Sequence, residues 1–270
     1  MINVAISGAS GRMGRTVMTA LMGEGDMTLS GALEMPGHPA LGTPALAEQG
    51  GPGEAAERIK ITDDMKAALE GADVLIDFSS PEGTVAVIRA AADAKIAAVT
   101  GTTGLSDDDV TRVTEASSVI PVVMAPNMSV GVNVLFKIAG EVAAVLGSAY
   151  DVEIIEAHHR QKVDAPSGTA KRLYEIIARA LERDTEKAGV YGREGMVGKR
   201  TTEEIGVMAV RAGDIVGEHT VIFGGIGERI ELVHRAHSRM TLASGAVRAA
   251  RWVIGRQPGM YDMQDVLGLS

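Results

Sequence analysis

Short, continuously apolar runs alternate with helical patterns over the first half of the chain, and this alternation limits the possible fold more than any other feature. The apolar runs, which we interpret as buried strands, are Val4–Ser7, Thr28–Leu33, Val74–Phe78, Ile96–Val99 and Val119–Met124. The segments with a helical pattern lie at about residues 13–22, 63–70, 83–94 and 106–118. Strands that are apolar on both faces are typical of a parallel sheet covered by helices on both sides. The first half is therefore predicted to be an α/β domain with a doubly wound parallel sheet.

The second half has a different pattern, in which helices are followed by consecutive strands. The expected elements are a helix at 130–146, a strand at 152–157, a helix ending at 180, a surface loop at 184–203, strands at 205–211, 216–223 and 229–237, and a helix at 241–254. Short turns separate the last three strands, which favours an antiparallel sheet. The change of pattern predicts a domain boundary near residues 127–131, with domains at 1–129 and 130–239. A further loop is expected at Pro36–Gly53, which is rich in proline and glycine.

Composition narrows the class of protein and its partners. With 270 residues, of which 46% are hydrophobic and 23% charged, the chain is long enough for two modest globular domains. The net charge of −9 argues against nucleic acid, because phosphate binding requires a basic face. The absence of cysteine excludes disulfides and thiolate chemistry. We find no signal-peptide pattern and no apolar stretch approaching the roughly 18 residues of a membrane span, so we expect a cytoplasmic protein without membrane contact.

A glycine-rich turn lies directly after the first predicted strand. Gly8, Gly11 and Gly14 have the spacing G-x-x-G-x-x-G and open the first predicted helix. Such glycines let the backbone approach a pyrophosphate, whose charge is stabilised by the helix N-terminus. Glu34 follows Gly14 by 20 residues, at the end of the second strand, where a carboxylate binds ribose hydroxyls. The glycines alone could serve helix–strand packing, but together with the acid they predict a dinucleotide site.

Three more segments follow predicted strands of the same sheet. They are Asp77–Pro81, Gly101–Gly104 and Ala125–Met128. Ligands of open parallel sheets bind beyond the carboxyl ends of the strands, so these segments are expected at the edge that carries the glycine turn. Each segment alone is equally compatible with an ordinary turn. Their coincidence at one edge favours a binding site.

The residues around Glu34 bear on which nicotinamide cofactor binds. Its carboxylate would repel the 2′-phosphate of NADPH, and Met35 brings no charge to offset that repulsion. Arg12 or Arg15 could still reach a phosphate. We therefore expect NADH to be preferred and NADPH to be tolerated.

The segment Glu153–Ala170 concentrates proton donors just upstream of a predicted helix start. Imidazole and ammonium groups donate protons, and helix-start amides bind anions, so a small carboxylate-bearing substrate is expected here. One carboxylate would lie on the helix-start amides and another against Lys162 and His159. His158 would donate a proton, because imidazole titrates near neutral pH. The residues of this predicted site are His158, His159, Arg160, Lys162, Ser167, Gly168 and Thr169.

Three other interpretations of this segment remain open. The two adjacent histidines could bind a metal, although they lack the helical i, i+4 spacing of a zinc site and we predict no metal. They could also be solvated surface residues without a function. Asp164 or Glu156 could pair with Lys162 as an exposed ion pair that contributes little stability.

The chain resembles the dihydrodipicolinate reductase family, also called 4-hydroxy-tetrahydrodipicolinate reductases, of lysine and diaminopimelate biosynthesis. The family's signature matches 153–170 throughout, and further similar segments are 8–14, 77–83, 101–104, 127–133 and 211–219. The resemblance implies an N-terminal Rossmann domain to which residues 240–270 return. It also implies a C-terminal α+β domain, for substrate binding and oligomerisation, whose open mixed, largely antiparallel sheet builds a homotetramer. The implied activity is NAD(P)H-dependent reduction of a cyclic dicarboxylate, 4-hydroxy-tetrahydrodipicolinate, to tetrahydrodipicolinate with loss of water.

The resemblance also implies roles for individual residues. His158 and Lys162 correspond to the catalytic pair. Contacts with the substrate are implied for His159, Ser167, Gly168 and Thr169. Contacts with the cofactor are implied for Gly8, Gly11, Arg12, Met13, Gly14, Arg15, Thr16, Glu34, Gly101, Thr102, Thr103, Ala125, Pro126, Asn127 and Met128. Many members place an arginine directly after the acidic residue, and Met35 at that position argues against a strong NADPH preference.

Two other functions share part of this pattern. Another two-domain nicotinamide enzyme, such as an amino-acid dehydrogenase, would have the glycine turn but not the 153–170 signature. A non-catalytic dinucleotide sensor would keep the glycine turn and would not need His158 or Lys162. The second motif, rather than the fold, favours the reductase.

Overall fold

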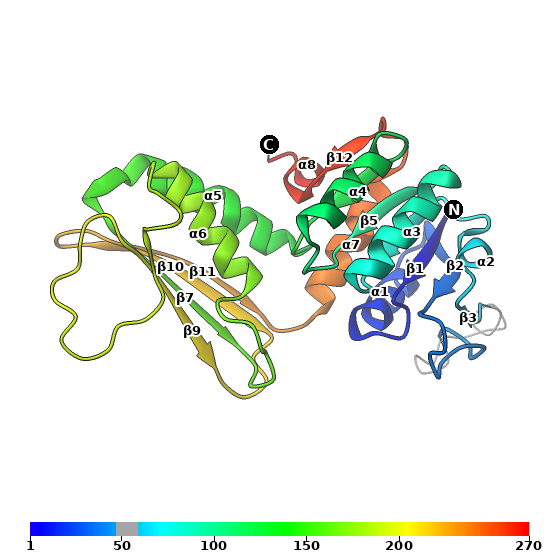
Figure 1. The fold of residues 1–270 in the computed structure, drawn as a ribbon, viewed down its shortest axis with the longest axis horizontal. Helices are drawn as coiled ribbons and strands as arrows, with labels where there is room; N and C mark the ends of the chain where they lie inside the picture. Colours follow the sequence, from blue (N-terminus) through cyan, green and yellow to red (C-terminus); the bar gives the residue numbers. More distant parts are fainter. Residues whose placement is uncertain (47–58, 270) are drawn as a thin grey trace. The chain divides into compact units, whose positions relative to one another are not determined.

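The computed structural model describes residues 1–46 and 59–269 and divides into two compact units (Figure 1). The first unit comprises residues 1–130 and 239–270, and the second comprises residues 131–238. The strands of the first unit are β1 (Ile2–Ser7), β2 (Met27–Leu33), β3 (Ile61–Thr62), β4 (Val74–Asp77), β5 (Ala97–Thr100), β6 (Pro121–Met124) and β12 (Gly259–Tyr261). Its helices are α1 (Arg12–Met22), α2 (Met65–Leu69), α3 (Pro81–Asp93), α4 (Asp107–Ser117), α7 (Met240–Val253) and α8 (Met263–Leu267).

The seven strands of the first unit form one parallel sheet in the order β3-β2-β1-β4-β5-β6-β12. The chain runs outward from β1 in one direction and from β4 in the other, which is the doubly wound Rossmann arrangement with its switch point between β1 and β4. The predicted fold class of the first half is therefore confirmed.

Apolar side chains cover both faces of this sheet. On one face Val4 and Ile6 of β1 pack in the same core as α1, α7 and α8. On the other face Ala5 of β1 packs with α2, α3 and α4. The separate core on each side explains why the strands are apolar without alternation. Ser80 and Ser106 cap α3 and α4 with their side chains.

Some short elements of the first unit are absent from the sequence prediction. β3, β12 and α8 were not expected, because two to five residues give no measurable periodicity. Residues 36–46 of the expected loop 36–53 form turns and one isolated bridge between Pro44 and Lys60. The remainder of that expected loop, residues 47–53, lies outside the described residues.

The second unit combines two long helices with a mixed sheet. Its elements are α5 (Val130–Leu146), the 3-10 turn η2 (Gly147–Ala149), β7 (Asp151–His158), α6 (Gly168–Ala180), β8 (Gly189–Val190), β9 (Ile205–Arg211), β10 (Gly217–Gly224) and β11 (Arg229–Ala236). The sheet order is β11-β10-β7-β9-β8. The pairs β10–β11 and β7–β10 are antiparallel, whereas β7–β9 and β8–β9 are parallel. The mixed sheet is as predicted.

The expected antiparallel pairing of β9 with β10 is wrong, because β7 lies between them. The connection from β9 to β10 crosses the end of β7 and is held there by backbone hydrogen bonds from Ala212 to the His158 carbonyl and from Arg160 to the Gly213 carbonyl. Five residues span about 16 Å when extended, whereas crossing one strand requires about 10 Å. The connection is therefore short in sequence and still long enough to pass over a strand.

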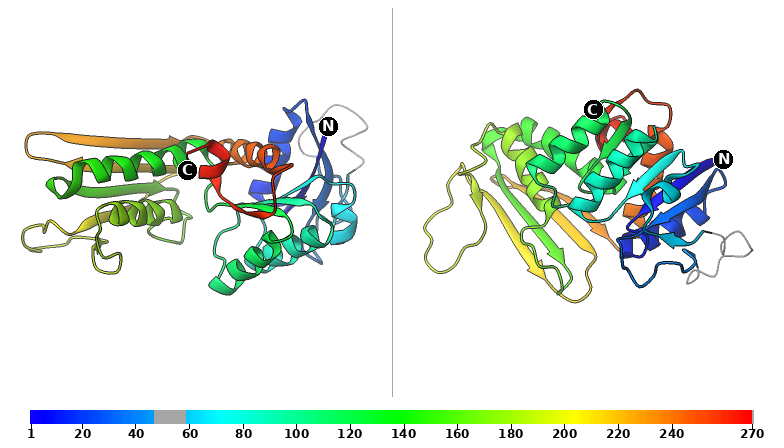
Figure 2. Two further views of the ribbon diagram at one scale, coloured as in Figure 1. Left: turned by 90° about the horizontal axis from the view of Figure 1, so that it is seen from above. Right: turned by 45° about the vertical axis from the view of Figure 1, so that its right-hand side comes forward.

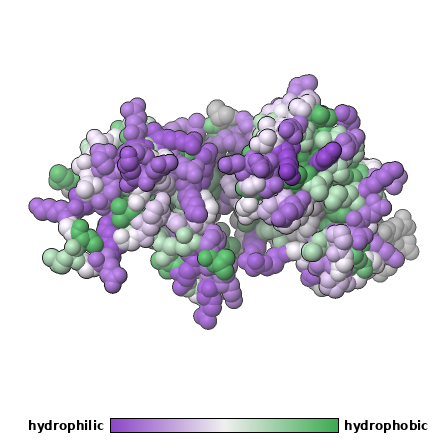
Figure 3. Space-filling view, viewed as in Figure 1, coloured by the Kyte–Doolittle hydropathy of each residue, from purple (hydrophilic) through white to green (hydrophobic). Residues whose placement is uncertain are grey.

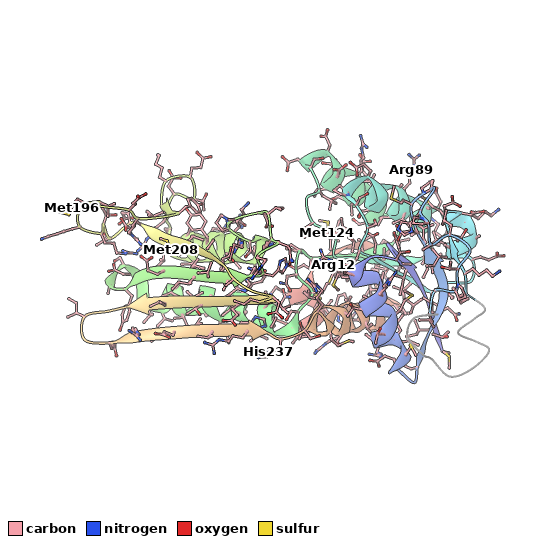
Figure 4. The ribbon with its side chains drawn as sticks, turned by 90° about the horizontal axis from the view of Figure 1, so that it is seen from below. Arg12, Arg89, Met124, Met196, Met208 and His237 are labelled. Atoms are coloured by element: carbon pink, nitrogen blue, oxygen red, sulfur yellow. The ribbon has the colours of Figure 1, made fainter. Side chains whose placement is uncertain are left out.

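Helices α5 and α6 pack on one face of the second sheet (Figure 2). Val152 and Ile154 of β7 face these helices. On the opposite face, cross-strand pairs place Met208, Ile155, Thr220 and Val233 in one row across β9, β7, β10 and β11. We call this side, with its half-exposed Ile155 and Val233, the open face. Figure 4 shows Met208 on β9.

The segment Val130–Ala149 is long and apolar enough to cross a membrane by length and composition alone. The expectation that no apolar stretch approaches that length is therefore wrong. In the structure Val132, Leu135 and Phe136 of this segment are buried in the core of the second unit, as in the core helix of a globular domain.

The side of the protein shown in Figure 3 carries mainly hydrophilic residues with separate apolar ones among them.

Candidate active site

The strand ends of the first sheet are aligned in one row. Ser7 of β1 is in register with Leu33 of β2 and with Asp77 of β4, which in turn is in register with Thr100 of β5. Thr100 is in register with Met124 of β6. The turns that follow these five strands therefore lie at one edge, and this edge carries every segment expected to bind the cofactor.

The glycine turn has a tight geometry that larger side chains would disturb. Gly8 has a φ of +72°, and a Cβ there would lie 2.4 Å from the Phe78 carbonyl oxygen. A Cβ on Gly14 would lie 2.2 Å from the Gly8 carbonyl oxygen. The close approach of a backbone oxygen thus explains why positions 8 and 14 have glycine. Gly11, the N-cap of α1, provides no side-chain cap, and the first-turn amides of a helix have no intrahelical acceptor, so this helix start fits a pyrophosphate.

Glu34 lies over the same turn. Its Oε2 accepts a hydrogen bond from the Ser10 amide at 2.9 Å, and its Oε1 accepts one from the Met35 amide at 3.0 Å. A cavity of about 460 Å³ adjoins Ser10 and is also lined by Arg15 and His38. Each carboxylate oxygen has a second lone pair, so Glu34 can accept further hydrogen bonds from ribose hydroxyls.

Asp77 connects two of the turns at this edge. It is fully buried, and its Oδ2 accepts hydrogen bonds from Thr84, Thr100 and Thr102 at 2.6, 2.9 and 3.0 Å. Its Oδ1 accepts one from Ser79 at 2.6 Å. The carboxylate therefore fixes the turn after β4 against the turn after β5. Sequence reasoning placed Asp77 at a strand end but did not identify this role.

The other expected cofactor residues differ in exposure. Arg12, labelled in Figure 4, is exposed at the start of α1, and Thr103 is exposed after β5. Met128 is buried to 1% exposure in the core beneath α7, so its side chain is not available to a ligand. The remaining members lie on the first turns of α1, after β5 or after β6: Met13, Arg15, Thr16, Gly101, Thr102, Ala125, Pro126 and Asn127.

His158 is the last residue of β7 in the second unit. Its Nδ1 lies 2.6 Å from Oε2 of Glu156, which is two residues earlier on the same face of the strand and fully buried. Arg211 at the end of β9 forms a bidentate pair with Glu156, at 2.7 and 2.8 Å. The Ser167 amide donates to Oε1 of Glu156 at 3.0 Å. Of the two partners that the sequence allowed for Lys162, Asp164 forms the ion pair and the buried Glu156 does not.

The loop after His158 holds the other cationic groups. Lys162 pairs with Asp164 at 2.9 Å, and its amide donates to the His159 carbonyl. Arg160 is exposed, and His159 is half-buried. Lys162 is close enough to His158 to lower the pKa of that imidazole, although burial is the larger cause. The structure therefore brings the two expected catalytic residues into one neighbourhood.

Ser167 has a structural role that the sequence did not indicate. It is buried, caps α6 by accepting a hydrogen bond from Ala170 at 3.2 Å, and lies 3.2 Å from Nε2 of His219 on β10. Its amide and hydroxyl are thus engaged within the protein. Gly168 is exposed and Thr169 is half-exposed at the helix start, where an anion would be stabilised.

Comparison with known proteins gives the same result for both halves of the chain. Residues 2–128 match the family model described as dihydrodipicolinate reductase, N-terminus, and residues 131–267 match the one described as dihydrodipicolinate reductase, C-terminus. The chain belongs to the dihydrodipicolinate reductase family. Proteins named 4-hydroxy-tetrahydrodipicolinate reductase in Geotalea daltonii and Thiobacillus denitrificans are each 52% identical to it, covering all of this chain and 100% and 99% of theirs.

Solved structures include a similar member of this reductase family. The dipicolinate-bound dihydrodipicolinate reductase from Paenisporosarcina sp. TG-14 aligns with a TM-score of 0.75 at 26% identity, covering 98% of each chain. A probable dehydrogenase from Thermotoga maritima aligns with a TM-score of 0.57 at 12% identity and shares the fold alone. The expected resemblance of the whole chain to the dihydrodipicolinate reductases is therefore confirmed.

Electrostatics in this reductase-family chain keep Glu156 charged and His158 neutral. Burial raises the pKa of Glu156, but the hydrogen bonds from Arg211, His158 and Ser167 together hold it below its usual value. Burial lowers the pKa of His158, and the hydrogen bond to Glu156 only partly offsets this. Burial also lowers the pKa of His219 to about 3, with the adjacent His158 adding to the effect. Both imidazoles are therefore neutral at pH 7 when no ligand is bound.

Proposed function

We propose that this protein is an NAD(P)H-dependent 4-hydroxy-tetrahydrodipicolinate reductase of lysine and diaminopimelate biosynthesis. In the reaction a hydride and a proton enter the ring, one water leaves, and tetrahydrodipicolinate is formed. Family membership supports this proposal. The observation that carries the chemistry is the buried His158, bonded to Glu156 and adjacent to Lys162 and the start of α6.

We propose that the unit of residues 1–130 and 239–270 binds the nicotinamide cofactor, which supplies the hydride. The glycine turn and the start of α1 would hold the pyrophosphate, and Glu34 would bind the adenosine ribose. The turn fixed by Asp77 and the segments 101–103 and 125–128 would complete the site at the same edge. We infer that NADH is preferred, because Glu34 repels a 2′-phosphate, and that Arg15 or Arg12 allows NADPH to be used.

We propose that the unit of residues 131–238 binds the dicarboxylate substrate. One carboxylate would lie on the amides of Gly168 and Thr169, and another against Lys162 and His159. A bound anion favours the protonated form of a neighbouring imidazole, so substrate binding would raise the pKa of His158 from its lowered value. His158 would then donate the proton that the reaction requires, while Lys162 holds the substrate or assists its protonation.

We also propose that the protein is a cytoplasmic homotetramer, with the open face of the second sheet as an interface between subunits. The row that crosses this face is largely apolar at Met208, Ile155 and Val233. Apolar side chains left half-exposed on a sheet face are stabilised when another subunit covers them.

Isotope transfer tests the proposed reaction. NADH carrying deuterium at both C4 positions would be mixed with the enzyme and freshly generated substrate. Mass spectrometry of the product should show tetrahydrodipicolinate that is one mass unit heavier than the product made with ordinary NADH. Cofactor binding without any deuterium transfer would contradict the reductase and favour a dinucleotide sensor.

A further inference from the structure

Glu156 occupies a position that is costly for a carboxylate. It is fully buried, and both of its oxygens are saturated, Oε2 by His158 and Arg211 and Oε1 by Arg211 and the Ser167 amide. Arg211 donates a further hydrogen bond, at 2.7 Å, to the Asp164 carbonyl in the loop that carries Lys162. Glu156 and Arg211 therefore join β7, β9 and the loop before α6 at the site.

The charge on Glu156 determines which nitrogen of His158 carries a proton. An ionised carboxylate can only accept hydrogen bonds, so the 2.6 Å contact requires a proton on Nδ1 of His158. In the neutral ring the lone pair then lies on Nε2. Without Glu156, both arrangements of the proton would be open to the ring.

The surroundings of the ring support a defined orientation. His219 packs edge-on against His158, with ring centroids 5.3 Å apart and planes at 74°. On the Nε2 side, a Cβ added to Gly217 would lie 3.1 Å from Nε2. The ring is thus bonded at Nδ1, packed against a second ring, and faced by a residue without a side chain at Nε2.

We propose that Glu156, held by Arg211, is a positioning residue that fixes the proton of neutral His158 on Nδ1 and leaves Nε2 for the substrate. This inference rests on the proposed function for its role in the reaction. The arrangement itself is a property of the unliganded protein. It can therefore be measured independently of turnover.

The ring ¹⁵N chemical shifts of His158 in the wild-type protein test this arrangement directly. The spectrum of His158→Gln identifies the resonances by their loss. We expect Nδ1 protonated and Nε2 unprotonated in neutral His158. Protonation on Nε2 instead would overturn the proposal, whether or not the enzyme turns over. A correct tautomer in a protein without turnover would retain the positioning by Glu156 and reject the proposed function.

Glu156→Gln tests the same relationship by substitution. A Gln amide that accepts from Ser167 turns its NH₂ group toward His158, and this group would donate to Nδ1 and move the ring proton to Nε2. We expect that change in the ¹⁵N spectrum, together with a loss of kcat of about 10²-fold or more and less than about a 3-fold change in KM for either substrate. An unchanged tautomer in the folded variant would overturn the proposal.

The pH profile separates positioning from a structural role. The groups that face His158 are Glu156 on its own strand, Arg211 on β9, His219 on β10, and Lys162 in the loop. Of these, only Glu156 raises the pKa of His158, so Glu156→Gln should move the alkaline fall of kcat/KM to lower pH. The matched control is Glu204→Gln, which also loses a carboxylate bonded to an arginine, Arg193, in the same unit. A uniform loss without a pH shift, or an equal loss in the control, would overturn the proposal.

Discussion

The carboxylate of Glu34 lies 2.9 Å from the amide nitrogen of Ser10 and is thereby fixed over the glycine turn at the end of β2. The bond holds the negative charge at the position where we propose that the adenosine ribose binds. A 2′-phosphate at that position would meet this charge. The preference between NADH and NADPH is therefore expected to depend on Glu34.

Replacing Glu34 with Ala should weaken NADH binding by about 10- to 150-fold, since a hydrogen bond to a charged group contributes roughly 1.5–3 kcal/mol. NADPH binding should be less affected, so that the difference in affinity between NADH and NADPH becomes smaller. Fluorescence titration with each cofactor measures both values. Glu115→Ala, on the exposed side of α4, serves as the control. An unchanged ratio between the two cofactors would show that Glu34 does not contact the ribose.

Replacing His158 with Gln should lower kcat by about 10²–10⁴-fold, the usual contribution of a general acid–base group. KM for the substrate should change much less, because the carboxylates would be held elsewhere. Steady-state kinetics give both parameters. His237→Gln, at an exposed histidine labelled in Figure 4, is the matched control. A near-normal kcat in His158→Gln would remove His158 from the mechanism.

Stability should fall as the pH decreases from about 6.5, because the pKa of His219 is about 3 in the fold and near its ordinary value of 6.5 when unfolded. Between these values the unfolded chain binds more protons, so the folded state loses stability as the pH falls. The contribution from His219 at pH 5 is a loss of about 2 kcal/mol. Urea unfolding at pH 7 and pH 5 should show a smaller loss of unfolding free energy in His219→Gln than in the wild-type protein. Equal losses in the two proteins would contradict the lowered pKa.

Replacing Val233 with Glu should convert the proposed tetramer to smaller species, because it places a charge in the row that crosses the open face. Light scattering coupled to gel filtration measures the mass. Val145→Glu on α5, where the side chain is 85% exposed, changes charge equally and should keep the tetramer. A tetrameric Val233→Glu protein would place the subunit interface elsewhere.

The sequence predicts most of the first unit because its strands are buried on both faces. Val74–Ile76 is apolar without interruption, and the structure places β4 there between two hydrophobic cores. β3 and β12 were not predicted, because they are only two and three residues long and become strands by pairing with β2 and β6. The wrong prediction that β9 pairs with β10 has a similar cause. The sequence of the short connection between them does not show that β7 lies between the two strands.

The residues of the candidate site were also only partly predictable from the sequence. His158 and Lys162 stand out by residue type, and the structure brings them together. The spacing of Glu156 could have indicated that it lies near His158, because residues two apart on a strand share one face. Arg211 of β9, which pairs with Glu156, and His219 of β10, which packs against the His158 ring, are each more than 50 residues from these partners in the sequence. Only the sheet register brings them to the end of β7.

Cofactor oxidation coupled to a synthase that makes the substrate from pyruvate and aspartate semialdehyde shows whether this protein reduces 4-hydroxy-tetrahydrodipicolinate. The absorbance of NADH and of NADPH would be followed with the synthase present and with it omitted. We predict rapid oxidation that depends on the synthase and is faster with NADH. Absence of synthase-dependent oxidation, in a protein shown separately to bind the cofactor, would contradict the assignment as a reductase of this substrate.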